Sequence, residues 1–172
     1  MAASARVRHR RACIMIDGLA LARAIHVLAL VHWIGGVAVV TTIVLPQARK
    51  LPDAGSAVAA FDAFERPFAR QARVSILLAG LSGAYMLIEL DAWERFLHAS
   101  FWWMHLMVAV WAVFALMVYV LEPLLLHENF RKFAFRRKDR AFTLATSFHG
   151  FALLASAIAI GAGVLGAHGS LP

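Results

Sequence analysis

The stretch that decides the fold is residues 19–45, LALARAIHVLALVHWIGGVAVVTTIVL, which is almost entirely apolar. A transmembrane helix needs about 20 predominantly apolar residues to cross the hydrocarbon of a bilayer, and this stretch is longer than that. Its polar content is small: one formal charge at Arg23, two histidines at His26 and His32, and two threonines. It therefore predicts a membrane-spanning helix, ending before Pro46, that takes ionisable side chains into the membrane.

Three further stretches have the same apolar character and lie at about residues 72–90, 101–126 and 142–166. The chain therefore predicts an all-α integral membrane protein, a four-helix bundle over residues 19–168. Residues 1–18 precede it as a basic N-terminal leader, with Met15 as an alternative start to Met1.

The composition excludes most soluble classes of protein. Of the 172 residues, 62% are hydrophobic and 16% are charged, with a mean hydropathy of +0.72. Soluble domains average about 45–50% apolar and about 25% charged residues, and a domain this small buries only part of its chain. A soluble nucleic-acid binder is thus excluded, and the single cysteine excludes a disulfide scaffold. The net charge of +7 is assigned to loops that face anionic lipid.

The distribution of Lys and Arg predicts the orientation, because cytoplasmic loops carry the excess of these residues. An even number of spans puts both termini on one side. That side carries Arg6, Arg8, Arg10, Arg11 and Arg95. The other side carries Arg49, Lys50, Arg66, Arg70, Arg73, Arg131, Lys132, Arg136, Arg137, Lys138 and Arg140. The second side is predicted to be cytoplasmic, which places both termini in the periplasm of a bacterium with the chain in its inner membrane.

The longer of the two predicted cytoplasmic loops, residues 47–71, contains Phe61, Phe64 and Phe68 at helical spacing. This pattern predicts a short amphipathic helix on the membrane surface, and a loop packed over the helix ends is an equal alternative. The basic loop at residues 131–140 is expected to contact anionic headgroups.

Polar side chains inside a membrane are costly, so their presence is a functional hypothesis by default. Four histidines lie in the predicted spans: His26, His32, His105 and His149. At about 1.5 Å per residue, His26 and His105 are expected to lie level with each other near the periplasmic face. His32 and His149 are expected to lie level about 10 Å deeper.

Small residues share helix faces with these histidines, which leaves room for a flat cofactor in the bundle core. A haem iron accepts neutral imidazole as an axial ligand. The pattern predicts haem b with His26 and His105 as axial ligands and Arg23 at a propionate. One haem is favoured over two, because the two histidine pairs are too close in depth for two porphyrins. His32 and His149 are candidates for a second haem, for replacing one ligand of the first, or for carrying protons to a quinone.

Other interpretations of the histidines remain open. Copper is the alternative cofactor, although Cu(I) prefers thiolate and thioether ligands and the methionines show no clustered spacing. In a non-catalytic membrane subunit the histidines would only hydrogen-bond one helix to another.

The first span also resembles a known family. Residues 23–36 read RAIHVLALVHWIGG, with His26 seven residues before a Trp-x-Gly-Gly motif. This resembles the first helix of the CopD-like copper-resistance membrane family and of the related bacterial membrane protoporphyrinogen IX oxidases, which are haem-b proteins. Residues 101–106, FWWMHL, are similar to a later helix of those oxidases, with His105 where the family has a lysine. The four-span layout is similar to that of a small four-helix member grouped with CopD-like proteins.

The resemblance implies that His26 is a haem ligand, and the histidine at position 105 favours bis-histidine ligation over oxidase activity. The predicted function is that of a cytochrome b-like protein that passes electrons in a respiratory or redox chain. Its expected partners are the lipid bilayer, a quinone or a periplasmic redox protein, and further copies or subunits of a complex. CopD-like copper transport, a non-catalytic subunit and protoporphyrinogen oxidation are the alternatives, so enzymatic activity stays open.

Overall fold

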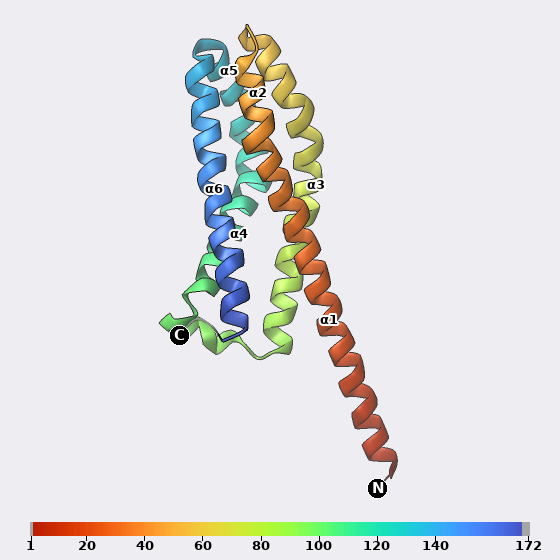
Figure 1. Ribbon diagram of the computed structural model, residues 1–172. Coiled ribbons are helices and arrows are strands. Elements are labelled where there is room, and N and C mark those ends of the chain that lie inside the picture. The colour runs from red at the N-terminus through yellow and green to blue at the C-terminus, as the bar shows by residue number, and fades with distance from the viewer. Residues whose placement is uncertain (1, 170–172) are drawn as a thin grey trace.

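The computed structural model describes residues 2–169, with side chains described for residues 18–122 and 129–169 (Figure 1). All regular elements in this part of the chain are helical. Four helical segments are long and apolar enough to span a membrane: Gly18–Lys50, Ala54–Glu89, Ala99–Glu122 and Lys138–Ala167. The predicted all-α bundle with four apolar spans is therefore confirmed. Nearly all of the predicted basic leader, residues 1–18, lies outside the residues whose side chains are described.

The first span is one continuous helical rod made of α1 (Ala2–Val39), the π-helical turn η1 (Val40–Val44) and α2 (Leu45–Lys50). The prediction that this helix ends before Pro46 is wrong. A proline in a regular α-helix clashes with the carbonyl four residues earlier, which here is that of Thr42. In η1 the N–H of Leu45 donates to Val40 O, so the backbone is wound more widely just before the proline and the helix passes through it.

The second span, α3 (Ala54–Glu89), is much longer than the predicted segment 72–90. It begins at Asp53, whose Oδ1 accepts a hydrogen bond of 2.8 Å from the N–H of Ser56 and so caps the helix. The amphipathic helix expected on the membrane surface is the first half of α3. Its aromatic face packs inside the protein instead: Phe61 is buried, and Phe64 and Phe68 pack against the core. The surface-helix prediction is therefore wrong.

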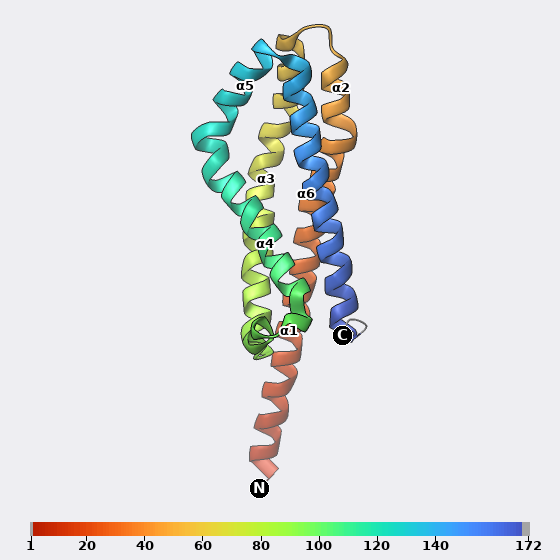
Figure 2. The same ribbon diagram turned by 90° about the vertical axis from the view of Figure 1, so that its left-hand side faces the viewer.

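The rest of the chain completes the bundle. Short 3₁₀ turns, η2 (Trp93–Leu97) and η3 (Ala99–Phe101), lead into α4 (Trp102–Leu116), the π-helical segment η4 (Met117–Leu126) and α5 (His127–Arg136). The last helix is α6 (Lys138–Ala167). Contacts are most extensive between α1 and α3 and between α4 and α6. The α2–α3 and α5–α6 connections meet at one end of the bundle, called here the α2–α3 end, and both ends of the described chain lie toward the other (Figures 1 and 2).

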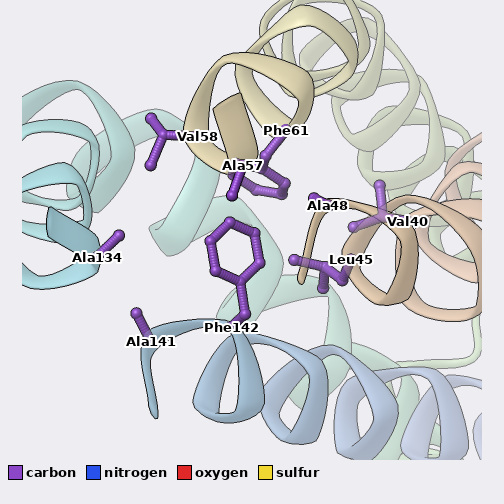
Figure 3. Close-up of a cluster of buried hydrophobic side chains, with 9 residues drawn as sticks. All are labelled: Val40, Leu45, Ala48, Ala57, Val58, Phe61, Ala134, Ala141 and Phe142. Carbon is purple, nitrogen blue, oxygen red and sulfur yellow. The ribbon is translucent and has the colours of Figure 1, made fainter. Parts of the chain in front are cut away.

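Three clusters of buried side chains hold the helices together along the length of the bundle. At the α2–α3 end, Phe142 of α6 lies between α3 and α2, with Phe61 packed edge-on at 6.3 Å (Figure 3). In the middle, the rings of Trp33 and Phe114 are perpendicular, 4.7 Å apart. At the opposite end, Trp103 and Met104 of α4 pack with Ala162 of α6. Large apolar side chains cover much of the outer surface, as expected for a protein whose outer faces contact lipid.

Candidate functional site

His26 is the candidate ligand that the fold positions best. Its half-buried ring crosses from α1 to α3, where Nδ1 lies 2.9 Å from Ala79 O and 3.1 Å from Ser82 Oγ. A carbonyl oxygen can only accept a hydrogen bond, so Nδ1 carries the proton. The other ring nitrogen, Nε2, is then unprotonated and carries a lone pair. This is the tautomer that binds a metal, and a carbonyl partner on Nδ1 is the usual way in which proteins fix it.

An apolar groove lies beside His26, between α1 and α3. Its volume is about 350 Å³, and it is open to one side of the bundle. Ser82, which contacts the His26 ring, also lines this groove. The other lining residues are Gly18, Leu21, Ala22, Ile25, Leu78, Leu81 and Tyr85. Arg23 is exposed on α1, about one turn before His26. His26 and Arg23 do not line the groove themselves, and the groove adjoins His26 through Ser82.

His105 lies elsewhere, on α4. Its Nε2 is 3.1 Å from Phe96 O and its ring stands edge-on to the Phe96 ring at 5.3 Å. Nε2 is therefore the protonated nitrogen of His105, by the same argument from the carbonyl. His26 faces α3 while His105 faces η2, so the structure gives the two histidines different partners and does not bring them together as a pair.

His32 and His149 are also apart. His32 is exposed on the outer face of α1, and half-buried His149 donates from Nδ1 to Ala145 O of its own helix at 2.9 Å. Gly150 lies against Thr41, which puts His149 about 15 Å along the axis from the level of His32. The two are therefore not level, because α6 begins before residue 142 and the first helical rod continues past residue 45.

A further polar site, made by Arg73, Tyr119 and Glu122, was not predicted. Arg73 on α3 donates from Nη2 to Glu122 Oε1 and from Nε to Val118 O, both at 3.3 Å. Tyr119 donates its hydroxyl proton to Arg73 O at 2.7 Å. Sequence reasoning placed Arg73 among the loop cations. The signal that identifies this site is the Glu-Pro pair at residues 122–123, which puts a carboxylate beside a helix-disrupting proline at the end of an apolar span.

Comparisons of the chain with protein-family models, with curated proteins and with solved structures found no match. Within the residues that the structure describes, no three or more His, Cys, Asp or Glu side chains form a group that could hold a metal ion. Haem iron differs from a bare ion because the porphyrin supplies most of its ligands, and the protein needs only one or two. The protonated Nδ1 of His26 leaves a lone pair on Nε2, which suits a haem held by this histidine. The different hydrogen-bond partners of His26 and His105 do not support pairing them, and their joint ligation stays a prediction.

Proposed function

We propose that this chain binds one haem b through His26 and passes electrons in the membrane, as a CopD-like, cytochrome b-like protein. The observation that carries the proposal is the hydrogen bond from His26 Nδ1 to Ala79 O, which leaves Nε2 free for iron. When bound, the haem supplies one-electron redox chemistry, and a quinone or a periplasmic redox protein would be the partner.

Two further features support this proposal. An apolar groove shares Ser82 with His26, so apolar walls of the kind that a porphyrin needs lie near the imidazole. Arg23 brings a guanidinium, which is well suited to pair with a propionate carboxylate. His105 keeps its hydrogen bond to Phe96 in this proposal and does not bind the iron.

We propose further that the α2–α3 end faces the cytoplasm of a bacterium and that both termini are periplasmic. The excess of Lys and Arg at this end supports the orientation. A periplasmic reporter fused to the C-terminus is expected to be active and a cytoplasmic reporter silent. The reverse result would contradict the orientation without bearing on haem binding.

The visible spectrum of the purified protein, expressed with added haem precursor, tests the cofactor. The wild-type protein is expected to show a Soret band and a reduced α band. His26→Ala is expected to lose them, whereas the matched control His32→Ala, on an exposed site of the same helix, is expected to keep them. A wild-type protein without a Soret band, or a His26→Ala variant with an unchanged one, would overturn the proposal. Copper retained in place of haem would favour the copper alternative.

A further inference from the structure

We propose that a groove between α2 and the start of α6 binds the headgroup of an anionic phospholipid. This groove lies at the α2–α3 end, far along the bundle from His26, and has a volume of about 490 Å³. It is lined by Arg49, Asp139, Arg140, Thr143 and Leu144. The proposal is independent of haem binding.

The charge of the groove suits a phosphate group. Two arginines, Arg49 and Arg140, and one aspartate, Asp139, are among the residues that surround it. Arg49 Nε lies 3.6 Å from Asp139 Oδ1, so this pair joins α2 to α6 across the groove. Lys138 donates to Leu51 O and fixes the same two elements beside each other. The residues around the groove therefore carry a net positive charge, and these contacts hold its two walls beside each other.

An apolar strip on the same face of α6 continues from this charged groove. Arg140, Leu144, Phe148 and Phe151 are spaced four, four and three residues apart, so they follow one face of the helix. The three apolar members are all exposed: Leu144 at 61%, Phe148 at 41% and Phe151 at 73%. A cation followed along the helix by an exposed apolar strip matches a phospholipid, whose phosphate is followed by acyl chains.

This combination favours a lipid over a free anion or an acidic peptide. A free phosphate would use the two arginines but not the exposed strip. An acidic peptide would have to compete with lipid for a strip that lies within the membrane-spanning segment Lys138–Ala167. Basic pockets between membrane helices are a known type of site for anionic headgroups.

The test is lipid binding by native mass spectrometry of the intact protein in a neutral detergent, titrated with phosphatidylglycerol or phosphatidylcholine. Arg140→Gln leaves the Arg49–Asp139 pair in place, and Arg136→Gln is its control. Arg136 is exposed on α5 at the same end and does not line the groove, so both variants have the same net charge. We expect phosphatidylglycerol to bind in preference to phosphatidylcholine, and Arg140→Gln to weaken this binding about fivefold while Arg136→Gln does not.

Three results would overturn the proposal. Equal losses in Arg140→Gln and Arg136→Gln would mean diffuse attraction to a basic surface. Full competition by inorganic phosphate at matched concentration would make the ligand a free anion. Equal binding of the two lipids would remove the requirement for negative charge.

Leu144→Gln tests the apolar strip separately. This variant is expected to weaken binding of the diacyl lipid and to leave binding of glycerol phosphate unchanged. Circular dichroism checks that each variant remains helical.

Discussion

Arg73 Nε on α3 donates a hydrogen bond of 3.3 Å to the carbonyl oxygen of Val118, which lies in the π-helical segment η4. In a π-helix each carbonyl accepts from the N–H five residues later, which for Val118 is position 123. Residue 123 is a proline and has no N–H. Arg73 supplies the missing donor and pairs with Glu122 at the same time, so one side chain satisfies both the backbone and the carboxylate.

Arg73→Leu is therefore expected to destabilise the protein. It leaves Val118 O and Glu122 without their donor, at a cost of about 2 kcal/mol, since the pair is only partly buried. Thermal unfolding in detergent measures the change as a lower Tm. Arg70→Leu removes the same charge from an exposed site one turn earlier on α3 and is expected to change the Tm little. Equal losses in the two variants would contradict a specific role for the contacts of Arg73.

The sequence was sufficient to predict the four spans. Every helix that crosses a bilayer needs about 20 consecutive apolar residues, and such a stretch can be recognised without knowing its neighbours in the fold. It was misleading at Pro46 and at residues 47–71. Pro46 is a helix stop only if the preceding turn is α-helical, and the wider turn at Val40–Val44 removes that condition. Phe61 was assigned to the membrane surface because its partner, Phe142, lies far away in the chain.

The candidate site was less predictable than the fold. Depths estimated from the sequence put His32 and His149 at one level, and the structure separates them because the helices extend beyond the predicted ends. The rotation of each histidine relative to neighbouring helices was not accessible at all. His26 and His105 are paired in the sequence analysis on depth, on neighbouring small residues and on a family resemblance, whereas their hydrogen bonds to Ala79 and Phe96 show that they face different elements. Which partner a polar side chain selects depends on long-range packing, and helical periodicity carries no information about that.

Gly36 is expected to tolerate no side chain, in contrast to its neighbour Gly35. A Cβ at Gly36 would lie 1.8 Å from a ring carbon of Phe68, whereas a Cβ at Gly35 would meet nothing within 4 Å. Gly36→Ala should therefore lower stability by about 1–3 kcal/mol, the usual cost of overpacking. Gly35→Ala should be neutral or stabilise by up to about 1 kcal/mol, because alanine favours the helix. Unfolding of both variants under the same conditions makes the comparison, and a Gly36→Ala variant as stable as Gly35→Ala would refute the close contact.

Asp53 is expected to make the start of α3 sensitive to acid. The hydrogen bonds from the N–H and hydroxyl of Ser56 lower the pKa of Asp53 from its ordinary value of 3.8. A lowered pKa in the folded state means that the ionised carboxylate stabilises the fold above about pH 4, and that this contribution is lost as the pH falls through the folded-state pKa. Asp53→Asn keeps an N-cap acceptor but cannot ionise. Its unfolding temperature should therefore fall less steeply than that of the wild type below pH 4, and parallel curves would contradict the assignment.

Arg23 provides the sharpest test of how a haem would sit beside His26, and this prediction depends on the proposed function. Arg23 is exposed on α1 about one turn from His26, and in the proposed complex its guanidinium would pair with a haem propionate. Arg23→Leu removes a cation that stabilises the oxidised and reduced forms unequally, because reduction lowers the charge on the iron. The variant is expected to retain less haem or to shift its midpoint potential, with unchanged helicity. Arg23→Lys keeps the charge and should lie between Arg23→Leu and the wild type. Redox titration of the three proteins decides the matter: if all of them share one potential and one haem content, Arg23 only extends its charge to the membrane interface.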